Sequence, residues 1–76
     1  MKVTLQSTTY IVYLDGLPAR IWEGTTESGI RVHALITRIA IDEWQNRTEF
    51  EKELQEHAPP SLEIANFYLI STRLVI

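Results

Sequence analysis

The sequence predicts an α+β domain in which an antiparallel three-stranded β-meander is followed by one α-helix and a C-terminal strand. Three observations predict this order. Asp15-Gly16 lies between two runs rich in β-branched and aromatic residues, a helix-capping pattern begins at Thr48, and apolar alternation returns from Phe67. Residues 1–76 have the length of one small domain, whose marginal core favours support by a partner or by self-association.

The first hairpin follows from Asp15-Gly16, a preferred two-residue turn because both of its central positions need a positive φ. With this turn, the residues of one apolar face pair across the two strands: Leu14 with Leu17, Val12 with Ala19, and Tyr10 with Ile21. Residues 1–8 are either a frayed end or an extension of the first strand.

A second, looser turn is expected within residues 23–29, where turn-forming residues separate two apolar runs. The third strand then covers residues 30–41. The apolar residues of this strand occupy even positions at its start and odd positions at its end, which predicts a bulge or bend near residues 35–38.

The helix is predicted from a capping box in which Thr48 is the N-cap and Glu51 reaches back to it. It runs to about His57 and is ended by Pro59-Pro60, and residues 67–76 form the last strand. A right-handed crossover makes this strand parallel to the third strand. It lies beside the first strand, in the order 4-1-2-3, in preference to a position beside the third.

The helix presents a narrow apolar stripe, Phe50 and Leu54, that needs a sheet to lie on. We expect it to cover the sheet face that carries Tyr10, Val12, Leu14, Ile21 and Val32. One helix covers only one face of a sheet, so the opposite face should stay available to another molecule.

The available face supplies the candidate partner-binding residues, which are Ile11, Tyr13, Arg20 and Trp22 from the hairpin, joined by Arg31 and His33 from the third strand. Tryptophan, tyrosine and arginine dominate binding hot spots because they combine large area with a polar group. A sheet-to-sheet homodimer would also cover this face. The alternative is that the chain folds more fully on itself, or that Trp22 packs under the loop at residues 23–29.

Composition excludes several functions. The chain has no cysteine, which rules out disulfides, thiol catalysis and cysteine-ligated zinc. His33 and His57 fall on different predicted elements, so we expect no metal site, no cofactor and no enzymatic activity. Residues 1–6 lack the apolar core of a signal peptide and no apolar run reaches a membrane span, which makes a cytoplasmic protein the expectation.

Charge is unevenly distributed along the chain. The net charge is −3, and residues 42–57 carry six carboxylates against two basic side chains, a net −4. This region is either a solvated outer face or an acidic surface for a basic partner. Arginine beside aromatic residues on a sheet also suggests single-stranded nucleic-acid binding, although the cations are few and the RNP aromatic pattern is absent.

Three stretches occur together in this chain: residues 15–24 (DGLPARIWEG), residues 36–40 (ITRIA), and residues 50–56 (FEKELQE) followed by Pro59-Pro60-Ser61. In this combination the chain resembles short, uncharacterised proteins encoded on bacterial phages and on integrative or plasmid elements. The resemblance covers about residues 10–76 and carries no assigned functional residue. It implies a genomic setting in which small acidic proteins bind and adjust a host protein.

Overall fold

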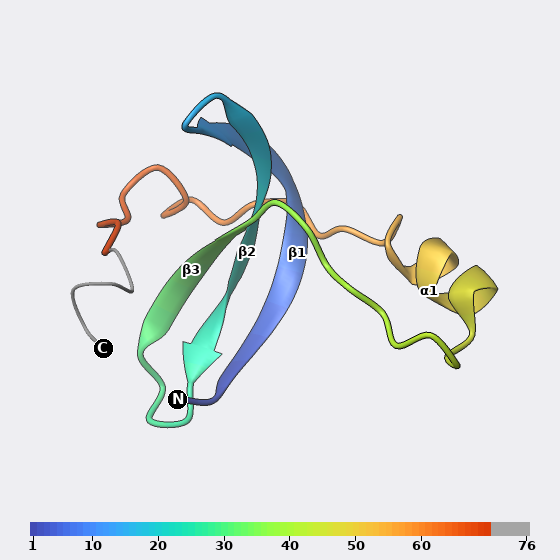
Figure 1. The fold of residues 1–76 in the computed structure, drawn as a ribbon. Helices are drawn as coiled ribbons and strands as arrows, with labels where there is room; N and C mark the ends of the chain where they lie inside the picture. Colours follow the sequence, from blue (N-terminus) through green and yellow to red (C-terminus); the bar gives the residue numbers. More distant parts are fainter. Residues whose placement is uncertain (71–76) are drawn as a thin grey trace.

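The computed structural model describes residues 1–70 and shows a twisted three-stranded antiparallel sheet with one short helix set off to one side (Figure 1). The strands are β1 (Val3–Leu14), β2 (Leu17–Thr26) and β3 (Arg31–Ile36), in the order β1-β2-β3, and the helix is α1 (Arg47–Glu53). The predicted meander and helix are confirmed. The predicted strand at 67–76 lies partly outside the described residues, and residues 67–70 form no strand.

The turn between β1 and β2 has the predicted geometry. Asp15 and Gly16 both have positive φ, 50° and 81°, as the two central positions of a type I′ turn require. Leu14 pairs with Leu17 and Val12 pairs with Ala19, which confirms the register next to the turn.

Farther from the turn, β1 contains a bulge that the sequence analysis missed. The pairing passes from Ile11–Arg20 directly to Ser7–Trp22, so three residues of β1 lie opposite Ile21. The predicted pairing of Tyr10 with Ile21 is therefore wrong. The hydroxyl of Thr8, which is buried, donates to the Ile21 carbonyl at 2.7 Å and accepts from the Tyr10 N–H at 3.2 Å. These two bonds satisfy backbone groups that the bulge takes out of the ladder.

The strand ends also differ from prediction. β1 begins at Val3, so the first residues extend the strand, and β2 continues to Thr26 before a short turn that contains Gly29 at φ 89°. β3 ends at Ile36, opposite Arg20, rather than at Ile41. Pro18 explains the early end. Because β2 and β3 are antiparallel, a longer β3 would next lie opposite Ala19 and then Pro18, and Pro18 has no N–H to donate to it.

The helix is shorter than predicted and begins earlier. Asn46, not Thr48, is its N-cap, and the Asn46 side chain accepts a hydrogen bond from the Glu49 N–H at 3.0 Å. α1 ends at Glu53 and has no buried residue. The exposed segment 37–46 carries it away from the strands, so α1 does not cover the face of Ile21 as predicted (Figure 1).

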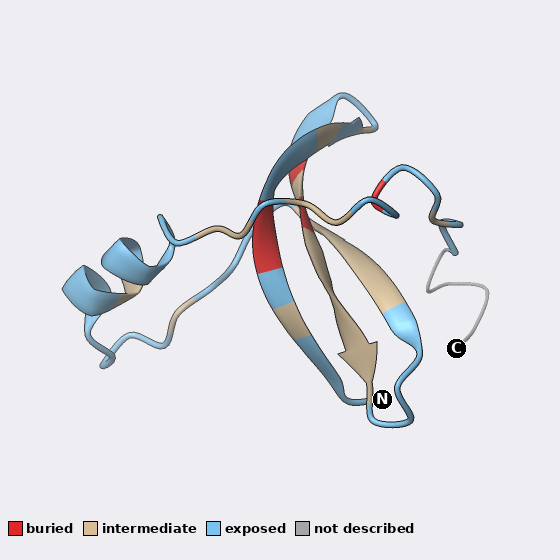
Figure 2. Cartoon of the chain, turned by 180° about the vertical axis from the view of Figure 1, so that it is seen from behind, coloured by how far each residue is buried: buried red, intermediate tan, exposed pale blue. Residues whose placement is uncertain are grey.

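A tail, residues 58–70, takes the place that the helix was expected to fill. Ala58 forms a parallel bridge beside the β1 bulge: its N–H donates to the Ser7 carbonyl at 2.9 Å, and its carbonyl accepts from the Thr9 N–H at 3.1 Å. Ile64 of the tail joins Ala19 and Ile21 as the buried apolar residues of the described chain. Figure 2 shows buried positions in β1, in β2 and in the tail. This core is small for a chain of this length.

Candidate functional site

The strand register divides the sheet into two faces, because residues paired across antiparallel strands point the same way. One face, here called the Trp22 face, carries Val3, Leu5, Ser7, Ile11, Tyr13, Pro18, Arg20, Trp22, Val32, Ala34 and Ile36. It contains no carboxylate, and Arg20 is its one charged strand residue. The opposite face, here called the Ile21 face, contains Ala19, Ile21, Glu23, Arg31, His33 and Leu35. The Trp22 face, which also includes Gly24 and Thr26, is therefore mostly apolar, with Ser7, Arg20 and Thr26 as its polar side chains.

The six candidate residues are divided between these faces. Ile11, Tyr13, Arg20 and Trp22 share the Trp22 face, whereas Arg31 and His33 lie on the Ile21 face because they pair with Thr25 and Glu23. Tyr13 is 76% exposed and Ile11 is 44% exposed, while Trp22 is half-buried. The expectation that β3 adds Arg31 and His33 to the hairpin surface is wrong.

Arg20 has a structural contact in addition to its position on this face. Its Nη1 donates to the Thr8 carbonyl at 2.9 Å, so the guanidinium ties β2 to the bulge of β1. The bond is charge-assisted and partly buried, which makes it stronger than a neutral pair. A variant that removes Arg20 therefore changes the fold as well as the surface.

A groove lies between the Trp22 face and an arm, residues 37–57, that includes α1. It has a volume of about 280 Å³, and its apolar lining residues are Trp22, Ile36, Ile39, Phe50 and Leu54. Polar groups of Arg20, Arg38, Glu53 and His57 also line it. The predicted inward stripe of α1, Phe50 and Leu54, thus faces a groove at the margin of the sheet. The stripe therefore borders the Trp22 face, and the predicted approach to the Ile21 face is wrong.

Trp44 is a further exposed aromatic residue that the sequence analysis did not select. It lies in the arm just before α1 and is 91% exposed. An apolar side chain of this size on a surface is a common feature of contact sites. In the sequence, Trp44 is marked by its residue type alone, a tryptophan within an otherwise acidic stretch.

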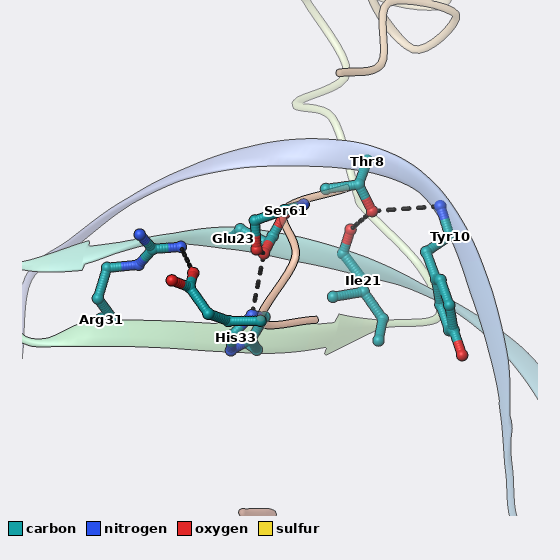
Figure 3. Close-up of polar contacts among 8 residues, drawn as sticks. Thr8, Tyr10, Ile21, Glu23, Arg31, His33 and Ser61 are labelled. Atoms are coloured by element: carbon teal, nitrogen blue, oxygen red, sulfur yellow. Dashed lines mark hydrogen bonds and ion pairs between the residues drawn. The ribbon is translucent and has the colours of Figure 1, made fainter. Parts of the chain in front are cut away.

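The Ile21 face holds a polar cluster centred on Glu23 (Figure 3). Its Oε2 lies 3.0 Å from His33 Nε2 and accepts a hydrogen bond from the Ser61 hydroxyl, and its Oε1 accepts from the Ser61 N–H at 2.9 Å. The Ser61 hydroxyl is the largest cause that lowers the pKa of the Glu23 carboxyl. Burial opposes the shift, and the Ser61 N–H and His33 add to it. The ionised carboxylate is thus the form that this cluster favours.

The order of these three residues differs from that of a serine-hydrolase triad. In a triad the imidazole lies between the hydroxyl and the carboxylate and removes the hydroxyl proton. Here the carboxylate of Glu23 lies between Ser61 and His33, so the histidine is not placed to activate the serine. The cluster instead fastens the tail to β2 and β3. A stacked contact between His33 and Phe67, with ring centroids 5.1 Å apart, adds to the same attachment.

Metal chemistry finds no support in the part of the chain that the structure describes. No group of three or more histidine, aspartate or glutamate side chains converges there as a metal-binding cluster. His57 instead lies 2.9 Å from the hydroxyl of Ser7, far along the chain from His33. Within residues 1–70, no helix has the length and apolar character needed to span a bilayer.

Comparisons of this chain with protein-family models, with curated proteins and with solved structures found no match. The class of protein is therefore defined by the fold and surface alone. It is a small α+β domain whose sheet has one face fastened under its own tail and one apolar face, the Trp22 face, bordered by a groove.

Proposed function

We propose that this chain is a non-enzymatic protein-interaction module of the cytoplasm that binds a protein partner through the Trp22 face. The observation that carries the proposal is the composition of this face: a mostly apolar surface with no carboxylate, with Arg20 as its one charged strand residue and with exposed Ile11 and Tyr13. Apolar surface of this kind on a small domain is typical of protein contact sites. The resemblance to short proteins of phages and mobile elements supports a host protein as the partner, and a sheet-to-sheet homodimer would also cover this face.

The residue types on the face also support protein contact. Trp22 and Tyr13 provide large rigid area, and Arg20 adds a planar charge beside them. The groove next to Trp22 offers a concave apolar site in which an anchoring side chain of a partner can be enclosed. Interfaces depend on such anchors more than on total area.

The test is capture of binding proteins by the immobilised chain. We expect the double variant Ile11→Ser and Trp22→Ala to capture at least tenfold less protein, including any copy of the chain itself. Arg20 is left unchanged because it holds the bulge. The matched control is Leu62→Ser combined with Tyr68→Ala, which removes two exposed apolar side chains of the tail.

Circular dichroism tests whether both double variants keep the strands. Equal capture by the folded Ile11/Trp22 variant and by the unsubstituted chain would remove the proposal. A loss shared by the control variant would contradict it too, because the effect would then not depend on the Trp22 face.

Single-stranded nucleic acid is the second candidate partner. It is favoured by the position of Arg20 beside Tyr13 and Trp22 on a sheet face free of carboxylates, since bases stack on aromatic rings while cations contact phosphates. Such binding weakens steeply with salt. The absence of retention on mixed oligonucleotides at about 50 mM salt, where this electrostatic attraction is strong, would eliminate it.

A further inference from the structure

We infer that the partner of the Trp22 face is a second copy of this chain, and that in a two-fold dimer the Tyr13 side chain of each copy enters the groove of the other. The inference rests on the proposed function, because it names the protein that the face binds. It also assigns a role to the groove, which the sequence alone did not reveal.

The first argument is the small core. The apolar residues that the described chain buries, Ala19, Ile21 and Ile64, all belong to the side of the sheet that the tail covers. On the Trp22 face, Ser7 is the one residue that is buried. A sheet needs a covering layer on each apolar face, and a 76-residue chain has little stability to lose. A covering molecule adds stability, and a second copy is available wherever the chain accumulates.

The second argument is that the Trp22 face carries both a projection and a hollow. Tyr13 projects near the hairpin turn, and the groove lies farther from the turn on the same face, beside Arg20, Trp22 and Ile36. A two-fold interface requires a surface that is complementary to itself, so that residue i contacts j while j contacts i. A projection and a hollow on one face meet that requirement.

The size and chemistry of the groove fit a tyrosine. An apolar cavity of about 150 Å³ is enough to hold a benzene molecule, and the groove has about 280 Å³. A buried tyrosine hydroxyl needs a hydrogen-bond partner. Arg38 and Glu53, which line the groove, offer a donor and an acceptor.

The charges of the Trp22 face are compatible with contact between two copies. When two Trp22 faces meet, no carboxylates of the strands come together. The charged strand residue that each copy contributes is Arg20, whose guanidinium is bonded to the Thr8 carbonyl of its own chain. The acidic arm of each copy, with a net −4 over residues 42–57, lies beside the groove that the partner enters. The paired strand faces therefore carry no carboxylate–carboxylate repulsion, and the charges near the contact are the two Arg20 side chains and the groove residues Arg38 and Glu53.

Sedimentation equilibrium over a range of concentrations tests the inference. We expect the unsubstituted chain to be a dimer at tens of micromolar, and Tyr13→Ala to raise the dimer dissociation constant at least tenfold. The matched control is Tyr68→Ala, since Tyr68 is 87% exposed but belongs to the tail. Both tyrosines are well exposed, so neither substitution should unfold the chain.

A mixing experiment tests the pairing of Tyr13 with the groove. Leu54→Glu places a charge in the groove on a helix without buried residues, and we expect it to weaken the dimer as Tyr13→Ala does. Tyr13→Ala keeps its groove and Leu54→Glu keeps its tyrosine. An equimolar mixture therefore retains one of the two contacts and should associate more strongly than either variant alone.

Two results would overturn the inference. One is a chain that stays monomeric up to about 100 μM. The other is a dimer that Tyr13→Ala and Tyr68→Ala weaken equally. A monomer that still captures a different protein in a manner dependent on Trp22 would refute the dimer while leaving the proposed function intact, so the two failures are distinguishable.

Discussion

The carboxylate of Glu23 accepts two hydrogen bonds from Ser61, one from its N–H at 2.9 Å and one from its hydroxyl, although the two residues are 38 positions apart in the chain. The same carboxylate contacts His33 on β3. One side chain thus joins β2, β3 and the tail, and it does so on the face that also contains Ile21. The attachment of the tail depends on the charge of this carboxylate.

Stability should therefore fall in acid. The pKa of Glu23 is lowered in the folded chain, so its stabilising contribution is complete above the ordinary glutamate pKa of about 4.3 and is lost as the pH drops through the lower folded value. We expect urea unfolding from pH 7 to pH 3 to show a smaller acid loss for Glu23→Gln than for the unsubstituted chain. Glu27→Gln, at an exposed turn residue, is the control and should leave the acid loss unchanged.

Removal of the Ser61 hydroxyl should raise the pKa of Glu23. That hydroxyl is the largest cause of the lowered value, so Ser61→Ala moves the carboxyl back toward the ordinary glutamate pKa, as an NMR titration of the Glu23 side chain will show. Stability at pH 7 should decrease by about 1–2 kcal/mol, since a partly buried charged acceptor loses a donor. Ser28→Ala in the exposed turn should change neither quantity, and an unmoved Glu23 titration in Ser61→Ala would contradict the assignment.

Thr8→Val should destabilise the bulge. Valine keeps the shape of threonine but leaves the Ile21 carbonyl and the Tyr10 N–H without the partner that Oγ1 provides. Leaving buried polar groups unpaired costs about 1–3 kcal/mol, measurable by urea unfolding. Thr9→Val, at the exposed neighbouring position, is the matched control. Equal stability of the two variants would show that the hydroxyl does not support the bulge.

Gly24→Ala should force β1 and β2 apart. A Cβ atom at this position would lie 1.7 Å from the carbonyl oxygen of Thr4, so the backbone of one strand has to move. Strain of this kind costs about 1–3 kcal/mol or more. We expect faster hydrogen exchange for the amides of residues 3–7 and a lower unfolding midpoint. Thr25→Ala, at the neighbouring position of the same strand, adds no atom at this contact and is the control.

The sequence was sufficient where structure is set by neighbouring residues. Asp15-Gly16 fixes the turn and the pairs next to it, because positive φ at both positions leaves one common hairpin geometry. The helix was also detectable, but its start was not. Asn46 and Thr48 are both good N-caps, and the structure uses Asn46.

Features that depend on distant residues could not be predicted in this way. The bulge of β1 is held by bonds from Thr8 to Ile21 and from Arg20 to Thr8, which no local pattern encodes. The sheet face of His33 depends on the register between β2 and β3. The sequence of the irregular turn around Gly29 does not determine this register to the residue, and a shift of one residue moves His33 to the other face. The position of the tail follows from Glu23 and Ser61, whose contact becomes visible only in three dimensions.

The bridge at Ala58 also has a consequence for the order of folding events. The two hairpins close through short turns, whereas the bond from Ser7 to the Glu56 carbonyl closes a loop between residues 49 positions apart, at a much larger entropic cost. The tail should therefore detach and reattach many times while the hairpins keep their hydrogen bonds. Such a local opening has a low free energy. In native-state hydrogen exchange, the amides of Thr9 and Ala58 should exchange together and well before those of β2, the central strand.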